Sequence, residues 1–217
     1  QGLVGIVCTT GPPLVHPWGG AERMLSTNPI AFAIPTAGPH PVVFDMSTSA
    51  QSNARIRQAA YHGEQVPEGS GVGPDGRPTT DARTIREKGA ISPLAGHKGF
   101  GLGLCVGLLA GPLVTAEVGR ALTGWIFEGE AGRQGHFFLA VDPAAFGDPD
   151  TFRRGVSAYL DEIKGSRKAP GVDAIRIPGE RAFAERERRL KEGVTVLEAT
   201  WTIIAGLARE LGVAVPA

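Results

Sequence analysis

The 217-residue chain contains few cysteines and no surplus of charge of either sign. Its two cysteines, Cys8 and Cys105, cannot provide a disulfide framework for a chain of this length, which indicates a reducing compartment. Lysine plus arginine and aspartate plus glutamate number 22 each, so no global field favours nucleic acid or an anionic membrane. We therefore expect a cytoplasmic protein that binds neither nucleic acid nor a membrane.

The chain also lacks the glycine fingerprint of a Rossmann domain, which is Gly-x-Gly-x-x-Gly directly after a strand. Gly99 and Gly101 begin such a pattern, but Leu104 stands where the third glycine is required. No group of aspartate and glutamate residues has the spacing of a magnesium site, so we expect no metal. These absences argue against a Rossmann domain and against a magnesium-dependent phosphotransferase.

The most informative stretch is the turn Gly96-His97-Lys98 and the uncharged, glycine-rich run that follows it to Ala110. The run predicts a helix, and free N–H groups at a helix N-terminus, together with a lysine, attract phosphate or carboxylate. A tight turn with a surface lysine and a hydrogen-bonded histidine explains the same residues. Composition alone does not separate the anion site from the plain turn.

Glycine recurs at every fourth position of this run, at Gly99, Gly103, Gly107 and Gly111. On a helix these residues form one smooth stripe, against which another element packs closely. The frequent glycine and the Gly111-Pro112 break argue against a membrane span. We expect a buried helix of a soluble protein, with Cys105 inside it as a small apolar side chain.

Hydrophobic periodicity and turn residues divide the rest of the chain into short strands and helices. We expect strands at residues 2–9, 30–35, 41–49, 135–142 and 174–177. We expect helices at residues 50–61, 150–163, 180–191 and 196–211. Residues 64–81 are so rich in proline and glycine that we expect an almost structureless loop, and loops of this length are usually functional or mobile.

Two bends carry polar side chains that allow two interpretations each. Thr27 and Asn28 precede Pro29, which should hold Asn28 extended, and they supply a hydroxyl and an amide for a ligand or for the turn itself. Asp45 stands near the end of a predicted strand. It suits ribose hydroxyls in a nucleotide site, and it equally suits the N-terminal cap of the next helix.

Four motifs, taken in order, resemble those of the type 2 malate/L-lactate dehydrogenase family. They are Ser26-Thr27-Asn28-Pro29, Asp45-Met46-Ser47-Thr48-Ser49, Pro93-Leu94-Ala95-Gly96-His97-Lys98-Gly99-Phe100-Gly101-Leu102 and Ile177-Pro178-Gly179-Glu180-Arg181. The resemblance extends from residue 2 to about residue 193. Relatives in this family include sulfolactate and ureidoglycolate dehydrogenases and the diketogulonate and piperideine-carboxylate reductases.

The resemblance implies an oxidoreductase that interconverts a 2-hydroxy acid of the malate or lactate type and a 2-oxo acid, with NAD or NADP as hydride carrier. It implies an α/β protein of the α+β type, in which helices cover a non-Rossmann, mixed, largely antiparallel sheet. Residues 1–170 would form the NAD(P)-binding sheet domain, and residues 171–217 a C-terminal helical part. We expect a homodimer whose other partner is the small 2-oxo or 2-hydroxy acid substrate.

Matching the family motifs residue by residue implies eight cofactor contacts and one substrate contact. The cofactor contacts are Asp45, Met46, Ser47, His97, Lys98, Gly179, Glu180 and Arg181, and the substrate contact is Thr27. An aspartate beside the ribose disfavours a 2′-phosphate through like-charge repulsion, whereas Lys98 favours one. The choice between NAD and NADP therefore stays open.

In this family the proton-donating histidine and the arginine that holds the substrate lie in an N-terminal helical segment that this sequence does not contain. The catalytic residues are therefore unknown, and Arg55 stands where some relatives carry an assisting aspartate. We expect the chain to carry mainly the cofactor-binding portion and to be inactive alone. The alternatives are a non-catalytic fragment that binds cofactor or dimerises through the glycine stripe, and a phosphate-handling transferase that uses Lys98.

Overall fold

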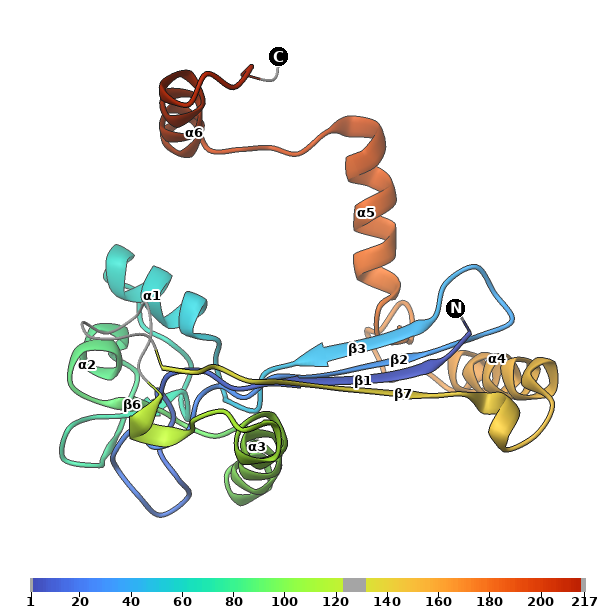
Figure 1. Cartoon of the computed structure of the whole chain (residues 1–217), viewed down its shortest axis with the longest axis horizontal. Coiled ribbons are helices and arrows are strands. Elements are labelled where there is room, and N and C mark those ends of the chain that lie inside the picture. Colours follow the sequence, from blue (N-terminus) through green and yellow to red (C-terminus); the bar gives the residue numbers. More distant parts are fainter. Residues whose placement is uncertain (1, 123–131, 216–217) are drawn as a thin grey trace. The chain divides into compact units, whose positions relative to one another are not determined.

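The computed structural model describes residues 2–122 and 132–215 and divides into two compact units, Gln1–Ile175 and Arg176–Ala217 (Figure 1). The first unit contains every described strand, arranged in two sheets. The second unit consists of two helices and the segments that flank them. The division falls at residues 175/176, five residues after the boundary of 170/171 expected from the resemblance.

A four-stranded sheet with the order β3-β2-β1-β7 spans the first unit. Its strands are β1 (Val4–Thr9), β2 (Ile30–Ile34), β3 (Val42–Met46) and β7 (His136–Val141). All four lie within the segments expected from the sequence. Every neighbouring pair is antiparallel, which confirms the predicted non-Rossmann sheet.

Helix α3 (His97–Ala110) packs on one face of this sheet (Figure 1). The contact is a hydrophobic cluster of Cys8, Ile30, Val106 and Ala110, with Ile6, Phe32, Met46 and Phe137 partly buried around them. Four of these side chains, one from each strand, stand side by side across the sheet and therefore share its covered face. Burial of this apolar surface holds α3 in place and fixes where its N-terminus lies.

The glycine stripe of α3 faces loops of the same unit. A Cβ atom added at Gly103 would lie 2.8 Å from Oγ1 of Thr48, and one added at Gly107 would lie 2.9 Å from Nδ2 of Asn28. The close packing expected of the stripe is confirmed. Because the stripe is covered within the chain itself, it is not available for dimerisation, which overturns that form of the fragment alternative.

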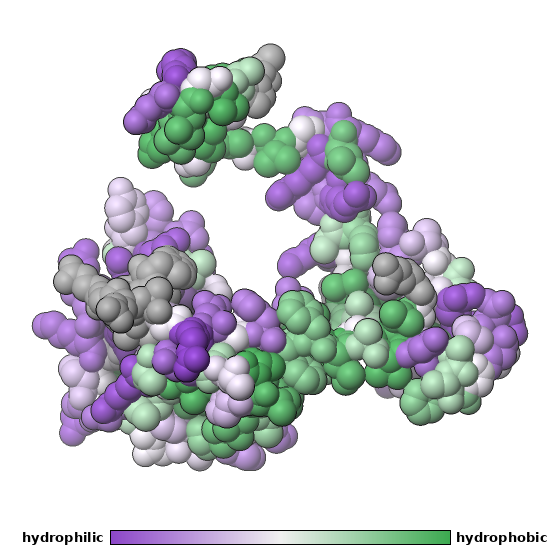
Figure 2. All heavy atoms as spheres, viewed as in Figure 1, coloured by the Kyte–Doolittle hydropathy of each residue, from purple (hydrophilic) through white to green (hydrophobic). Residues whose placement is uncertain are grey.

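The opposite side of α3 is open in the described part of the chain. Leu104 is 44% exposed, Leu108 is 50% exposed, and Cys105 is exposed as well. Figure 2 shows hydrophobic residues gathered over this region. The prediction of a buried helix with Cys105 inside it is therefore wrong for this side. By length and composition, His97–Val114 also passes as a membrane span, a test that core helices of soluble proteins pass too.

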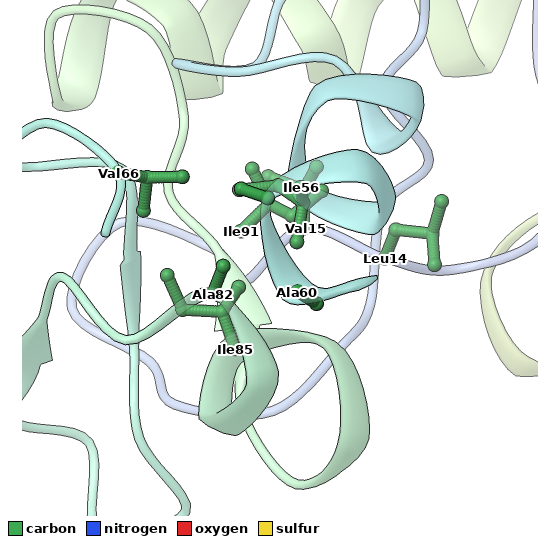
Figure 3. Close-up of a cluster of buried hydrophobic side chains, with 9 residues drawn as sticks. Leu14, Val15, Ile56, Ala60, Val66, Ala82, Ile85 and Ile91 are labelled. Atoms are coloured by element: carbon green, nitrogen blue, oxygen red, sulfur yellow. The ribbon is translucent and has the colours of Figure 1, made fainter. Parts of the chain in front are cut away.

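A smaller three-stranded sheet, in the order β5-β4-β6, packs with two helices in the same unit. The elements are β4 (Gly71–Val72), β5 (Pro78–Thr79), β6 (Ala90–Ile91), α1 (Asn53–His62) and α2 (Ala82–Glu87). Their shared core, shown in Figure 3, consists of Leu14, Val15, Ile56, Ala59, Ala60, Val66, Ala82, Ile85 and Ile91. The expectation of an almost structureless loop at residues 64–81 is wrong, because that range contains β4 and β5.

Polar side chains begin both of these helices. The Ser52 hydroxyl accepts a hydrogen bond from the N–H of Arg55 at 3.2 Å and so caps α1, which means that Asp45 does not cap it. The Asp81 carboxylate caps α2 by accepting from two main-chain N–H groups at 3.1 and 3.3 Å and from the hydroxyl of Thr84. The Thr84 hydroxyl is the main cause that holds the pKa of Asp81 below its usual value.

We expect Asp81→Ala to lower the free energy of unfolding by about 1 kcal/mol at neutral pH, because the first turn of α2 loses its acceptor. The pKa of Asp81 is lower in the folded than in the unfolded chain, so its contribution is present above about pH 4 and is lost as the pH falls through the folded value. Denaturant unfolding at several pH values should show the two proteins converging in acid. Asp81→Asn keeps an acceptor and serves as the control; equal stability at pH 7 would contradict the cap.

The first unit ends with α4 (Pro149–Gly165), which is capped by Asp148. Short 3-10 turns lie at η1 (Pro112–Val114), η2 (Gly119–Ala121) and η3 (Pro143–Ala145). The second unit contains α5 (Glu180–Glu192) and α6 (Glu198–Glu210), as predicted. The strand expected at residues 174–177 is not formed: the alternation of Ile175 and Ile177 resembles a strand, but no described strand pairs with it.

Candidate functional site

The loop that follows β3 lies between the bend that precedes β2 and the loop that precedes α3. The N–H of Thr48 donates to the carbonyl of Thr27 at 2.9 Å, and its hydroxyl approaches the same carbonyl at 3.1 Å. On its other side, the carbonyl of Thr48 accepts from the N–H of Leu94 at 2.9 Å. These bonds place Thr27, the Asp45–Ser47 segment and the start of α3 on adjoining pieces of chain.

The turn before α3 has an unusual backbone. Ala95 has a φ of +48° and Gly96 a φ of +67°, a region that residues other than glycine rarely adopt. Gly96 is the N-terminal cap residue of α3 and provides no side-chain hydrogen bond to the first turn. His97 and Lys98 follow and are both exposed. The first turn of α3 thus has no side-chain cap and lies beside an exposed histidine and an exposed lysine.

The three residues expected at the end of β3 have different environments. Asp45 is exposed on the edge strand of the sheet, whereas Met46 packs into the cluster under α3. Since neighbouring strand residues point to opposite faces, the two side chains cannot face one ligand together. The Ser47 hydroxyl lies 3.1 Å from that of Ser49 and belongs to the turn. Asp45 is the residue of this segment whose side chain faces solvent freely enough to meet a ligand.

The third predicted segment begins α5 in the second unit. Gly179 has a φ of +98° and is the N-terminal cap residue of the helix. The Glu180 carboxylate accepts a hydrogen bond from the N–H of Ile177 at 3.1 Å, so it helps to close this helix start. Arg181 is exposed in the first turn.

Asn28 has a role that the sequence left undecided. Its side chain is 2% exposed, accepts a hydrogen bond from the Thr10 hydroxyl at 3.0 Å and donates to the carbonyl of Gly103 at 2.7 Å. The φ of Asn28 is +32°, so the expectation of an extended residue before proline is wrong. The amide bonds residues far away in the chain rather than its own turn, which excludes the self-bonded turn.

Three cavities among the described residues of the first unit are lined by other residues than those predicted. One of about 440 Å³ lies beside α3 and includes Ser26, Asn28, Phe100, Leu104, Leu108 and Arg120 in its lining. Two others, of about 500 and 550 Å³, lie toward the opposite end of the main sheet. Across residues 2–122 and 132–215, no three His, Cys, Asp or Glu side chains come close enough to hold a metal ion. Arg55, at the position of the assisting aspartate, is exposed on α1.

Known proteins resemble the chain over almost its full length. L-sulfolactate dehydrogenase of Methanothermobacter thermautotrophicus is 37% identical over 211 residues, which cover 97% of this chain and 60% of that protein. Malate dehydrogenase of Pyrococcus horikoshii is 34% identical over 220 residues, which cover 98% of this chain and 60% of that protein. The chain therefore spans about 60% of the length of these curated relatives.

Solved structures share the fold. Malate dehydrogenase from Entamoeba histolytica superposes with a TM-score of 0.92 at 26% identity, over 100% of this chain and 63% of that one. Sulfolactate dehydrogenase from Methanocaldococcus jannaschii gives a TM-score of 0.88 at 34% identity, over 99% of this chain and 61% of that one. A family model described as malate/L-lactate dehydrogenase matches residues 1–205. The chain belongs to the malate/L-lactate dehydrogenase family.

Proposed function

We propose that this chain is the NAD(P)-binding part of an oxidoreductase that interconverts a 2-hydroxy acid and a 2-oxo acid. The observation that carries the proposal is the junction at Thr48, which joins the segment after Asp45 to the segment before Lys98. The names of the similar proteins support the substrate class, because malate and sulfolactate are both 2-hydroxy acids. The cofactor, when bound, takes or gives the hydride of the reaction.

The residues at this junction suit a dinucleotide. The uncapped first turn of α3 and the exposed Lys98 offer N–H groups and a positive charge to the pyrophosphate. The exposed Asp45 carboxylate offers an acceptor to ribose hydroxyls. His97 and the main chain of Met46 and Ser47 would line the same site. Gly179, Glu180 and Arg181 belong to the second unit and stay predictions from the family motif. Thr27 would lie beside the substrate.

The proposal predicts that the chain binds NADH or NADPH and that Lys98→Ala weakens this binding about tenfold or more. A charge-assisted hydrogen bond to a phosphate contributes about 1.5–3 kcal/mol, and 1.4 kcal/mol corresponds to a factor of ten. Fluorescence titration with each nucleotide measures both affinities and shows which one is preferred. Affinity should fall as salt is added, because the contact is between exposed charges.

Lys88→Ala is the matched control for this experiment, because Lys88 is another exposed lysine of the same unit and lies outside the proposed site. It should bind as tightly as the unmodified chain. Saturable binding without turnover would fit the cofactor-binding part. Absence of binding for both nucleotides, or an unchanged affinity in Lys98→Ala, would contradict the assignment.

We also propose that the open side of α3 forms a homodimer interface. No charged residue occurs between Gly99 and Ala116, and the exposed leucines of α3 form a continuous apolar face, which marks an interaction surface on a protein. We further propose a cytoplasmic location without a nucleic-acid or membrane partner. This rests on the equal numbers of acidic and basic residues and on the two free cysteines.

The dimer proposal predicts that Leu104→Glu/Leu108→Glu shifts the chain from dimer to monomer. Two buried charges in an apolar contact oppose association strongly. Light scattering after size-exclusion chromatography gives the mass of each protein. Tyr61→Glu is the control, because Tyr61 is 81% exposed on α1, away from this face. The Cys105 thiol should react more slowly with a thiol reagent in the dimer than in the monomeric variant. A monomer before any substitution would refute the interface.

A further inference from the structure

Residues 15–18 lie alongside the loop that leads into α3. Val15 and Ile91 form a parallel bridge, in which the N–H of His16 donates to the carbonyl of Ile91 at 3.1 Å. Residues 15–18 therefore run beside the stretch where β6 ends and the turn before α3 begins.

His16 is buried, with 6% of its surface exposed, and both nitrogens of its ring are hydrogen-bonded. Its Nδ1 lies 2.8 Å from the carbonyl oxygen of Pro17, which can only accept, so Nδ1 carries the proton. Its Nε2 lies 3.1 Å from Oγ of Ser92 and, in this tautomer, accepts from that hydroxyl. The ring thereby joins the 15–18 segment to the residue four positions before Gly96.

Trp18 contacts the turn itself. A Cβ atom added at Gly96 would lie 2.9 Å from Cζ3 of the Trp18 ring, so the indole covers the main chain at the cap position. The indole also meets the ring of His97 edge-on, with 6.3 Å between centroids and 64° between planes. Trp18 remains 59% exposed, which is more than a side chain retained only for the core would be.

We propose that His16 and Trp18 are positioning residues for the anion-binding turn at the start of α3. Ala95 and Gly96 both have positive φ, and Gly96 has no side chain to cap the helix. Such a backbone persists when surrounding contacts hold it. His16 holds the start of the turn through Ser92, and Trp18 covers its end at Gly96. Together they keep the first-turn N–H groups of α3 and Lys98 directed at one phosphate. This proposal rests on the proposed function.

Two measurements on His16→Leu and Trp18→Ala test the proposal. We expect each variant to bind the preferred nucleotide about tenfold more weakly, because the turn must then be ordered on binding. We expect amide hydrogen exchange in peptides covering residues 93–99 to be about fivefold faster or more, with β1 peptides unchanged. Kd values come from titration with NADH and NADPH, and exchange is followed by mass spectrometry on the free chain.

Three controls separate positioning from general destabilisation. His16→Gln retains an acceptor for the Ser92 hydroxyl and should recover most of the affinity lost in His16→Leu. Ser92→Ala should add little to His16→Leu, because both remove the same hydrogen bond. Tyr61→Ala removes another exposed ring of the same unit and should change neither readout.

The outcomes distinguish this proposal from the one on which it rests. If Lys98→Ala weakens binding while His16→Leu and Trp18→Ala bind as the unmodified chain does, the positioning role is wrong and the cofactor site stands. If Lys98→Ala changes nothing, the cofactor site is wrong. Exchange rates at residues 93–99 that are unchanged in both variants overturn the positioning role in either case.

Discussion

Gly103→Leu is expected to lower the melting temperature of the first unit by about 10 °C, or to prevent its folding. A Cβ atom at this position would lie 2.8 Å from Oγ1 of Thr48, which is itself 3% exposed and bonded to the carbonyls of Thr27 and Asn28. Thr48 therefore has no free space into which to move. Overpacking of this kind costs about 3 kcal/mol, and about 3 °C is lost for each kcal/mol in a domain of this size.

Gly101→Leu is the matched control on the same helix. No atom lies within 4 Å of a Cβ placed at Gly101, so the larger side chain meets open space. Replacing glycine inside a helix also favours the helical state by up to about 1 kcal/mol. Thermal unfolding followed by circular dichroism should place this variant at or above the unmodified chain. A Gly103→Leu protein that melts with it would show that α3 does not pack on the loop at Thr48.

The sequence was a good guide wherever an element depends on its own residues. The strand at Ile30–Ile34 begins directly after Pro29, and α3 ends at Gly111-Pro112, as turn chemistry predicts. The two-residue strands could not be predicted in this way. Gly71 belongs to β4 because it approaches Ala90 of β6, 19 positions further along the chain, and not because of its neighbours in sequence. Conversely, residues 174–177 have the alternation of a strand but no described partner strand.

The burial of helix α3 likewise could be predicted only in part from the sequence. Its lack of charge predicted burial, yet the sequence could not say which side would be covered. The glycines select the covered side because only a bare backbone lets Thr48 and Asn28 approach. Cys105 and the leucines then occupy the side left open. In α3 the glycine stripe marks the side that packs against the rest of the unit, and the leucines on the other side form the surface proposed as the dimer interface.

The candidate site was predictable in its motifs and not in its connections. Asp45 and Lys98 could be named from resemblance, whereas the role of Thr48 between their segments depends on hydrogen bonds that appear only after folding. His16 was missed because a lone histidine among prolines gives no ligand signal. Its contact with Ser92, like that of Trp18 with His97, joins segments about 80 residues apart and appears only after folding.

Asn28→Ala is the second substitution with a large expected effect. The side-chain amide of Asn28 accepts a hydrogen bond from the Thr10 hydroxyl at 3.0 Å and donates one to the Gly103 carbonyl at 2.7 Å, and both hydrogen bonds are buried. Alanine leaves both buried groups without that partner, and each unpaired group lowers the free energy of unfolding by about 1–3 kcal/mol. Asparagine also tolerates positive φ better than alanine does, and φ here is +32°. We expect a loss of about 3 kcal/mol in the free energy of unfolding. Thr10→Val, which removes one bond, should lose about 1 kcal/mol.

Asn28→Asp separates the loss of hydrogen bonds from the burial of charge. An aspartate here keeps the size of the side chain, but when ionised it only accepts, so it faces the Gly103 carbonyl with a negative charge. Burial and this carbonyl should raise the pKa of the new carboxyl above its unfolded value of about 4. A raised pKa in an acid means that stability is lost as the pH rises, so Asn28→Asp should be least stable near neutral pH. It should recover toward pH 4, where the protonated acid can donate to the Gly103 carbonyl. Asn28→Ala has no group to titrate and should keep a constant deficit relative to the unmodified chain across this range. Denaturant unfolding at pH 4 and pH 7 compares the variants, and parallel pH profiles for the two would show that the amide does not bridge the bend and α3.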